Sequence, residues 1–481
     1  KINWEPDYIK EGRFGEWLRE IKDWAISRER YWGTPLPVWI QTGENQSAKI
    51  KNQNEKYLVV DSVETLKKYT KKNGNTFIFV RHGEAENNVG DICNSDPTKV
   101  YYLTEKGKKD AQTVAKKIKT ADAVYVSPFL RTKETAEIIA EEIGFKKEKI
   151  KEDERLRELN FGDFDGQPYS SYLKHDEETL TTYDMPLPNG ESYNDAKKRL
   201  ADFIYDIDAE HHNEKIVVVT HGMGLEAIAA VVEGADLKRS KEIIDSYTPK
   251  PSEVLEFEFI PLPHNANFEL DLHKPYIDEM VLEKDGQEYR RVKEVMDVWF
   301  DSGAMPFAQD SDQRSNLKNS KRFDLGELYP ADFISEALDQ TRGWFYTLHA
   351  IGILMGRGAA YRNVICLGLL MDKDGKKMSK SVGNVIDPWE AIEKHGADAL
   401  RLWMYSVNQP GDPKNYNDRG VEEINRRLFN ILDNVYSFLS LYTGGERSDL
   451  KNSERSVLEE PIHILDKWII VRLNELIGLT T

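Results

Sequence analysis

The sequence predicts an α/β protein in which one doubly wound domain is inserted into another α/β domain, followed by the start of an α-helical bundle. In the middle third of the chain, short β-rich runs alternate with helical patterns, which is typical of a doubly wound sheet. All ten tryptophans lie outside residues 75–260, so this third differs in composition from its flanks. After Arg419 the apolar residues recur at spacings of three and four, as on one face of a helix.

The predicted elements follow from these patterns. Buried parallel strands are expected at residues 76–80, 123–126 and 216–220, and amphipathic helices at 106–118 and 131–143. Candidate linkers are the polar stretch 41–55 and the proline-bearing stretch 261–267. Near the end of the chain, one helix from Val421 to Leu439 should stop at Gly444 and Gly445, and a second should open near Leu465.

Bulk composition narrows the class of protein. With 40% hydrophobic and 31% charged residues, the 481-residue chain has the composition of an ordinary soluble protein. No apolar run reaches the length of about 18 residues needed for a membrane span. The two cysteines, Cys93 and Cys366, exclude a disulfide scaffold and a Cys-rich zinc site, and favour a reducing cytoplasm. A net charge of −17 argues against a general nucleic-acid-coating protein but leaves contacts through local basic patches open.

A basic loop follows an apolar run in the last part of the chain. The run from Val364 to Met371 is followed by Lys377-Met378-Ser379-Lys380-Ser381, which lies between Gly375 and Gly383. Two ammonium groups on a glycine-flanked loop can follow a polyphosphate as it is cleaved. The alternative is a solvated basic loop without a ligand.

Lys-Met-Ser-Lys-Ser is the signature loop of class I aminoacyl-tRNA synthetases, and this chain resembles them. Residues 26–37 resemble the segment that follows the editing insertion in the isoleucine, valine and leucine enzymes. Residues 297–306, 329–332 and 336–345 resemble the isoleucyl-tRNA synthetases in particular. The resemblance implies a class I Rossmann-type catalytic domain, a helical anticodon-binding domain and a cytoplasmic location. It also implies isoleucine, ATP and tRNA(Ile) as partners, with Mg²⁺ accompanying ATP.

The resemblance implies roles for five polar residues. Lys377 and Lys380 would stabilise the charge of the departing pyrophosphate, and Lys380 would contact ATP. Glu336, Asp339 and Gln340 would hold the aminoacyl-adenylate through its ribose and amino groups.

Other features of the synthetase segments are less specific or missing. Trp299 and Trp344 match positions that would wall the isoleucine pocket, although a tryptophan is more often a core residue. Taken alone, the segment around Glu336 also fits a charged helix N-terminus capped by Ser335. None of the ten histidines forms the His-x-Gly-His motif that the class requires. We therefore expect a piece of a longer protein, unable to activate isoleucine alone, with no protein ligands for zinc or another metal.

Two predicted strands of the inserted segment end in His-Gly. Arg81-His82-Gly83-Glu84 follows the run at 77–80, and Thr220-His221-Gly222 follows the run at 216–219. Because carboxyl ends of parallel strands meet at one edge of a sheet, the two imidazoles should lie together there. Arg131, after a third strand, adds a guanidinium, and Glu158 adds a carboxyl group.

This ordered set resembles the histidine phosphatase (phosphoglycerate mutase-like) superfamily over about residues 75–260. The resemblance implies that His82 accepts a phosphoryl group as a phosphohistidine, and that Glu158 protonates the leaving oxygen. The implied phosphate ligands are Arg81, Asn88, Arg131 and His221. The substrate would be a phosphorylated small molecule that the sequence does not identify.

Together the resemblances divide the chain into four segments. The synthetase catalytic domain takes residues 1–72 and 263–418, the inserted domain 73–262, and the start of the anticodon-binding domain 419–481. The favoured interpretation is an isoleucine–tRNA ligase fragment that carries a phosphatase-type insertion. Two alternatives remain: a chain that acts only as a phosphohydrolase through His82, and an insertion that is a non-catalytic interaction module.

Overall fold

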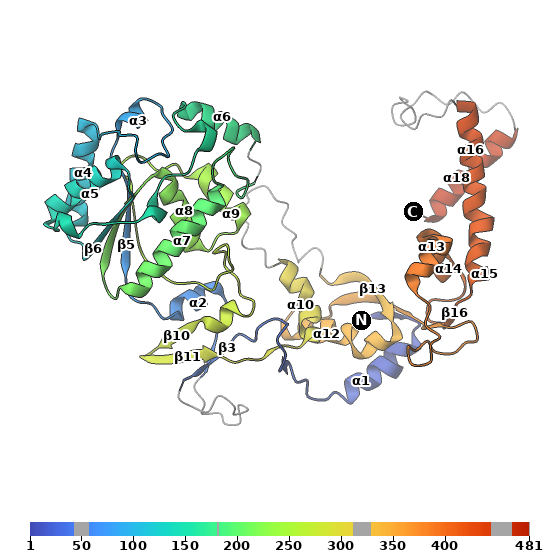
Figure 1. The fold of residues 1–481 in the computed structure, drawn as a ribbon. Helices are drawn as coiled ribbons and strands as arrows, with labels where there is room; N and C mark the ends of the chain where they lie inside the picture. Colours follow the sequence, from blue (N-terminus) through green and yellow to red (C-terminus); the bar gives the residue numbers. More distant parts are fainter. Residues whose placement is uncertain (43–56, 180–181, 311–328, 444–463, 481) are drawn as a thin grey trace. The chain divides into compact units, whose positions relative to one another are not determined.

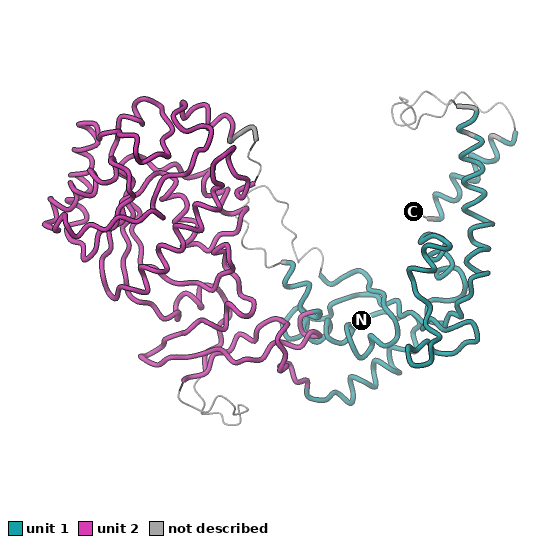
Figure 2. The backbone as a smooth tube through the Cα atoms, viewed as in Figure 1, with its two compact units in different colours: residues 1–23, 302–481 teal, residues 24–301 magenta. Residues whose placement is uncertain are grey.

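The computed structural model describes residues 1–42, 57–179, 182–310, 329–443 and 464–480. These residues form two compact units, one made of residues 24–301 and the other of residues 1–23 with 302–481 (Figure 2).

The larger unit is built on a five-stranded sheet. Its strand order is β7 (Lys151–Glu152), β6 (Ala123–Val126), β8 (Lys215–Thr220), β5 (Thr76–Arg81) and β9 (Val254–Glu258). All neighbours pair in parallel except β9, which runs antiparallel to β5. The three strands predicted for the inserted segment are therefore confirmed, and the two that end in histidine are neighbours.

Helices cover both faces of this sheet (Figure 1). The helices α4 (Glu105–Ile118) and α5 (Leu130–Ile143), both predicted, pack against Ile78, Val80 and Val217. On the opposite face, α7 (Tyr193–Glu210) and α8 (Gly222–Glu233) pack against Phe77, Phe79 and Val218. Because successive strand residues point to opposite faces, the continuous apolar runs of β5 and β8 supply both cores. The sheet is doubly wound, as predicted.

Shorter elements complete this region of the larger unit. They are α3 (Glu86–Val89), α6 (Tyr169–Thr179), α9 (Leu237–Ser246) and 3₁₀ turns at Lys147–Lys149, Glu154–Leu156 and Gly162–Phe164.

A second sheet in the same unit joins the chain before the inserted segment to the chain after it. Its order is β10 (Val281–Lys284), β11 (Gln287–Arg291), β3 (Val38–Gln41) and β4 (Tyr57–Val59), all antiparallel. Trp39, Leu66 on α2 (Val63–Tyr69) and Leu282 form its core. Since β3 pairs with β11, the chain leaves this sheet, forms the doubly wound domain and returns to the same sheet. Most of the predicted linker 41–55 lies outside the described residues.

Short elements flank this second sheet. The strands β2 (Ser27–Arg28) and β12 (Val295–Met296) pair with each other, and a 3₁₀ turn spans Tyr276–Glu279. Asp297, directly after β12, is buried and accepts hydrogen bonds from Trp24 and Arg28.

The smaller unit contains a parallel three-stranded sheet with β14 (Tyr361–Leu367) between β1 (Asn3–Glu5) and β13 (Ala331–Ala337). Phe345, on α12 (Trp344–Leu354), packs with Val364 and Cys366 in its core. The segment around Glu336 is thus a strand, and the alternative of a helix N-terminus capped by Ser335 is wrong. The strands β15 (Leu370–Met371) and β16 (Lys414–Asn415) pair beyond this sheet.

The remaining elements of this region are mostly helical. They are a π-helical turn at Lys10–Phe14, α1 (Gly15–Arg19), α10 (Val298–Asp310), which spans the boundary between the units, a 3₁₀ turn at Leu338–Arg342, α13 (Pro388–His395) and α14 (Ala397–Ser406).

The C-terminal helices agree with the apolar spacing. A continuous helical stretch contains α15 (Asp418–Ile424), a π-helical turn (Asn425–Phe429) and α16 (Asn430–Thr443). The second predicted helix is α18 (Ile464–Thr480). Gly444 and Gly445, the predicted stop, lie outside the described residues. Across the part of the chain that the structure describes, none of the helices has the length and apolarity to cross a membrane.

Candidate active sites

The two predicted histidines meet at the carboxyl edge of the five-stranded sheet. Arg81 pairs with Thr220 in register, and the backbone N–H of His82 donates to the carbonyl of Thr220 at 3.0 Å. The two imidazole rings lie with centroids 5.3 Å apart, and both side chains are buried. The expectation that parallel strands bring His82 and His221 together is confirmed.

Arg131 sits between the two imidazoles and determines their tautomers. Its Nε donates to His82 Nε2 and its Nη2 donates to His221 Nδ1, both at 3.1 Å. A guanidinium has only donors, so both of these ring nitrogens must be unprotonated acceptors. His82 therefore carries its proton on Nδ1, which donates to the Gly83 carbonyl at 2.8 Å. The lone pair of His82 Nε2 faces the guanidinium, where a phosphate would bind.

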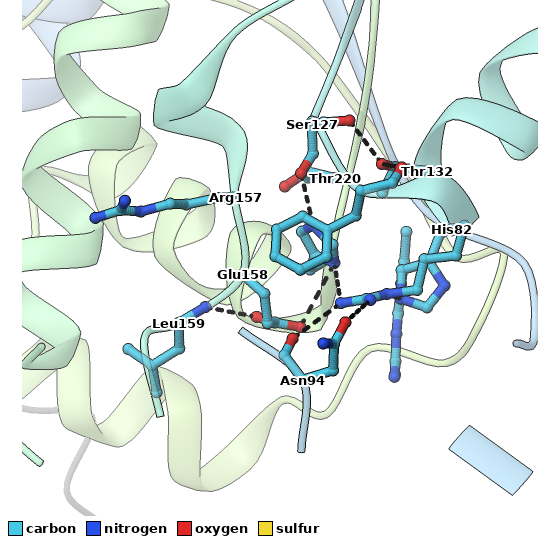
Figure 3. A network of polar contacts seen from close by, with 12 residues as sticks. His82, Asn94, Ser127, Thr132, Arg157, Glu158, Leu159 and Thr220 are labelled. Atoms are coloured by element: carbon cyan, nitrogen blue, oxygen red, sulfur yellow. Dashed lines mark hydrogen bonds and ion pairs between the residues drawn. The ribbon is translucent and has the colours of Figure 1, made fainter. Parts of the chain in front are cut away.

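His221 is held in the complementary tautomer. Its Nε2 carries the proton and donates to Ser127 Oγ at 2.7 Å (Figure 3). Thr132 Oγ1 in turn donates to the Ser127 carbonyl at 2.8 Å, which keeps this turn in place. His221 is thus a rigid neutral ring beside His82.

Burial shifts the pKa values of the histidines and of the carboxyl group in this site in opposite directions. Burial, followed by the charge of Arg131, lowers the pKa of both His82 and His221 well below the ordinary value of 6.5. Burial raises the pKa of Glu158 above its ordinary 4.5, although the charge of Arg131 opposes this. Glu158 Oε2 lies 3.7 Å from His221 Nδ1, and its Oε1 accepts from the Leu159 N–H at 3.0 Å. The site therefore pairs an imidazole that stays neutral more readily with a carboxyl group that is protonated more readily than in water.

Asn94 is a member of this network that the sequence did not reveal. Its Oδ1 accepts from Arg131 Nη1 at 2.5 Å and its carbonyl accepts from Arg131 Nη2 at 3.3 Å (Figure 3). Burial lowers the pKa of Arg131 to about 10, which still leaves the guanidinium charged at neutral pH. Asn94 follows no strand and belongs to no His-Gly motif, so only its burial beside Arg131 identifies it.

The two other predicted phosphate ligands differ in their surroundings. Arg81 donates through Nη1 to the Pro249 carbonyl, and its buried Nε has no hydrogen-bond partner among the described residues. A donor without a partner is available to an anion. Asn88 Oδ1 instead accepts from the Ala85 N–H at 3.0 Å, at the start of α3. The structure gives Asn88 a contact within its own turn, and its phosphate contact stays a prediction.

The basic loop of the smaller unit is closed at its base and exposed at its lysines. Asn384 donates to Asp372 Oδ2 at 2.8 Å and to the Lys377 carbonyl at 3.2 Å, and accepts from the Ser379 N–H at 2.9 Å. The hydrogen bond from Asn384 is the largest cause of a lowered pKa of Asp372. Lys377 and Lys380 are exposed. Asp372 and Asn384, which sequence reasoning missed, thus hold the loop while its two ammonium groups extend into solvent.

Glu336, Asp339 and Gln340 lie where β13 ends and the next 3₁₀ turn begins. Glu336 and Asp339 are exposed. Gln340 Oε1 accepts from the Trp344 N–H at 2.9 Å, and its Nε2 donates to Asp339 Oδ2 at 3.1 Å. Open α/β sheets bind ligands at this carboxyl edge, so the position suits the predicted adenylate contacts.

The two predicted pocket tryptophans lie in different units. Trp299, on α10, is 41% exposed. Trp344 is half-buried at the start of α12, and its Nε1 donates to the Ser302 carbonyl at 3.2 Å. Their role as pocket walls stays a prediction.

Comparison with known families assigns the two candidate sites to segments that match different families. The profile of the tRNA synthetases class I (I, L, M and V) matches residues 1–91 and 261–415, which is more than half of the chain. The chain belongs to this family. The profile of the histidine phosphatase superfamily (branch 1) matches residues 77–248, which overlap the end of the first synthetase segment and stop before the second.

Two relatives and one solved structure are similar to parts of this chain. The isoleucine–tRNA ligase of Deinococcus radiodurans is 47% identical over 211 residues, which is 43% of this chain and 19% of that protein. That of Bacteroides fragilis is 42% identical over 222 residues, 46% of this chain and 19% of that protein. The chain thus spans about a fifth of the length of these relatives. Among solved structures, Bacillus stearothermophilus YhfR is 24% identical with a TM-score of 0.34, covering 41% of this chain and 98% of that one.

Proposed function

We propose that the full-length protein to which this chain belongs activates isoleucine with ATP to form the adenylate and transfers it to tRNA(Ile) in the cytoplasm. The supporting observation is the loop at Lys377–Ser381, whose base is held by Asp372 and Asn384 while Lys377 and Lys380 are exposed. A loop held in this way presents two ammonium groups to the pyrophosphate as its charge develops. Mg²⁺ is proposed to enter with the ATP phosphates, as part of the substrate.

The adenylate is proposed to bind at the carboxyl edge of the three-stranded sheet. The Asp339 carboxylate and the Gln340 amide are already linked at 3.1 Å and present oxygens to ribose hydroxyls or to the ammonium group of isoleucine. Glu336, near the end of β13, supplies a second carboxylate. Trp344 is proposed to contact the aliphatic side chain.

Binding of an adenylate analogue tests this proposal on the 481-residue chain itself. Asp339→Ala is expected to weaken binding of a non-hydrolysable isoleucyl-sulfamoyl adenylate at least about tenfold, because a charge-assisted hydrogen bond contributes roughly 1.5–3 kcal/mol. Isothermal titration calorimetry measures the change. Asp332→Ala is the matched control, since Asp332 is an exposed carboxylate on β13, the strand that precedes Asp339, and is paired with Arg362. Equal loss in both variants, or none in Asp339→Ala, contradicts the assignment.

We further propose that the inserted domain hydrolyses phosphate monoesters through His82. The supporting observation is the unprotonated His82 Nε2 facing the Arg131 guanidinium. Nε2 attacks phosphorus, the bond from phosphorus to the leaving oxygen breaks, and Glu158 gives its proton to that oxygen. Water then attacks the phosphohistidine, Glu158 takes up the water proton, and phosphate leaves with the His82 lone pair restored. Arg81, Arg131 and His221 hold the phosphate oxygens, with Asn88 as a further contact.

The activity of the inserted domain is expected to depend on pH with a bell shape. As pH falls through the lowered pKa of His82, the imidazole is protonated and cannot attack, so kcat/KM falls. As pH rises through the raised pKa of Glu158, the carboxylate can no longer donate, so kcat/KM falls again. Steady-state kinetics with an alkyl phosphate from about pH 4 to 9 measures both limbs. An acid limb centred at or above pH 6.5 would contradict the assignment of His82.

A further inference from the structure

The end of helix α4 in the doubly wound domain carries lysines without carboxylate partners. From Ala111 to Ala121 the chain contains no acidic residue, while Lys116, Lys117 and Lys119 are all exposed. Nowhere among the described residues do their three ammonium groups form an ion pair or a hydrogen bond. On a chain whose net charge is −17, a local group of unpaired cations is a candidate contact for a polyanion.

Two further lysines lie at the same end of the domain. The segment that contains Lys146 and Lys149 leads into β7, as the end of α4 leads into β6. Because β6 and β7 are parallel neighbours, both segments reach the amino edge of the five-stranded sheet. Lys146 and Lys149 are exposed and, within the part of the chain that the structure describes, have no ion pair. We call the lysine face the set of Lys116, Lys117, Lys119, Lys146 and Lys149.

The carboxylates near the lysine face lie on α5 and the turn after it. α4 and α5 pack side by side on one face of the sheet (Figure 1). Glu141 is paired with Lys147 at 3.0 Å. The other exposed carboxylates of this segment are Glu137, Glu142 and Glu148. A polyanion that lies along the end of α4 therefore meets lysines, and the glutamates limit how far it extends over α5.

Lys119 has a backbone conformation that a residue with a Cβ rarely adopts. Its φ of 67° and ψ of −46° form a tight turn in which the Thr120 N–H donates to the Ile118 carbonyl at 2.8 Å. This γ-turn is strained for lysine, whereas glycine adopts a positive φ at lower cost. Strained residues gather where their side chains have a function. The conformation thus supports a function for the ammonium group of Lys119.

The surroundings of the lysine face favour a nucleic-acid backbone as its partner. Between residues 103 and 168, the described part of the chain exposes no large apolar side chain. Protein interfaces depend on aromatic and apolar anchors, and recognition of unpaired bases depends on aromatic rings for stacking. Lysines without such neighbours are suited to phosphate groups, whose contacts with protein do not depend on base sequence.

The lysine face and the phosphate site lie at opposite edges of the sheet. His82 and His221 follow the carboxyl ends of β5 and β8, whereas the lysine face is at the amino edge. The chain also enters and leaves the domain at the amino edge, where the Phe259 N–H donates to the Asn75 carbonyl at 3.1 Å. A nucleic acid on the lysine face therefore leaves the His82 site open and lies at the edge from which the chain continues to the second sheet.

We propose that the lysine face binds the phosphate backbone of tRNA, so that the inserted domain adds a tRNA contact to the synthetase. This proposal rests on the proposed transfer of isoleucine to tRNA(Ile). Each ammonium group that contacts a phosphate releases a condensed counterion, so the contribution of the lysine face falls as salt rises.

Titration of fluorescently labelled tRNA(Ile) with the 481-residue chain tests the lysine face. Anisotropy gives Kd from about 50 to 300 mM NaCl for the wild-type chain and for Lys116→Gln/Lys117→Gln/Lys119→Gln. The triple variant is expected to weaken binding at least about tenfold at the lowest salt and to reduce the slope of log Kd against log salt by about 2, because three phosphate contacts are lost. The matched control, which removes the same charge from α7 and α9, is Lys198→Gln/Lys238→Gln/Lys241→Gln.

Lys119→Gly separates the side chain from the turn that carries it. Because glycine adopts this φ with less strain, the variant is expected to unfold at a higher Tm, while its tRNA binding weakens about threefold. A raised Tm with unchanged tRNA binding overturns the function assigned to the Lys119 side chain.

The outcomes separate this proposal from the function it rests on. If the triple variant and the control bind tRNA alike, the lysine face is not a tRNA contact. A loss confined to binding of phosphatidylserine vesicles also overturns the proposal, because a lipid surface is then the polyanion. Both results leave the adenylate site standing, since titration with the adenylate analogue measures that site independently. A circular dichroism spectrum equal to that of the wild-type chain shows that the triple variant is folded.

Discussion

Replacing His82 with alanine is expected to lower phosphate monoester hydrolysis by a factor of at least about 10³, because the nucleophile of the first step is lost. The structure offers no equivalent substitute among the described residues around the site. His221 has its Nε2 proton committed to Ser127, and its Nδ1 accepts from Arg131. Phosphate release from 1-naphthyl phosphate by His82→Ala and by the wild-type chain measures the difference.

Two comparisons make the His82 experiment decisive. His212→Ala changes a histidine on a loop of the same domain, outside the polar network, and should retain full activity. Trapping the wild-type chain with radiolabelled ester should label a histidine, and the label should be absent in His82→Ala. Since His82 is buried, circular dichroism must show that the variant is folded. Folded His82→Ala with more than about a tenth of the wild-type rate would require another nucleophile.

Replacing both Lys377 and Lys380 with alanine is expected to lower isoleucine-dependent ATP–pyrophosphate exchange about 10²- to 10³-fold in the full-length synthetase, because two cations that stabilise developing phosphate charge are removed. Both side chains are exposed, so the substitutions should leave the fold unchanged. The effect should appear mainly in kcat, since the lysines act on charge that develops in the transition state.

Lys373→Ala provides the control for this experiment. Lys373 is an exposed lysine at the start of the same loop and lies outside the five-residue motif. Its loss should change exchange less than about twofold. If the double variant and Lys373→Ala behave alike, net positive charge and not the position of Lys377 and Lys380 explains the activity, and the role proposed for the motif is wrong.

The strands and helices of the inserted domain were predictable because the positions that are buried carry apolar residues. The runs Phe77–Val80 and Ile216–Val219 are apolar at every position, which a strand needs when both faces of its sheet are covered. The meeting of His82 and His221 followed from the same runs, since neighbouring parallel strands end at one edge. The strand at Ala331–Ala337 was harder to predict, because its charged and polar residues fit a helix start as well. Its parallel pairing with β14 shows that this segment is a strand.

The chain sequence by itself determined the family and predicted the order of the domains and the chemical groups of both candidate sites, because motifs and apolar periodicity are local properties. Only the tertiary structure decided which ring nitrogen of His82 is unprotonated and can act as the proposed nucleophile. That choice depends on Arg131 donating to Nε2 and on the Gly83 carbonyl accepting from Nδ1. It also decided that Asn94, Asp372 and Asn384 take part, since hydrogen bonds between residues distant in the chain have no signature in its spacing.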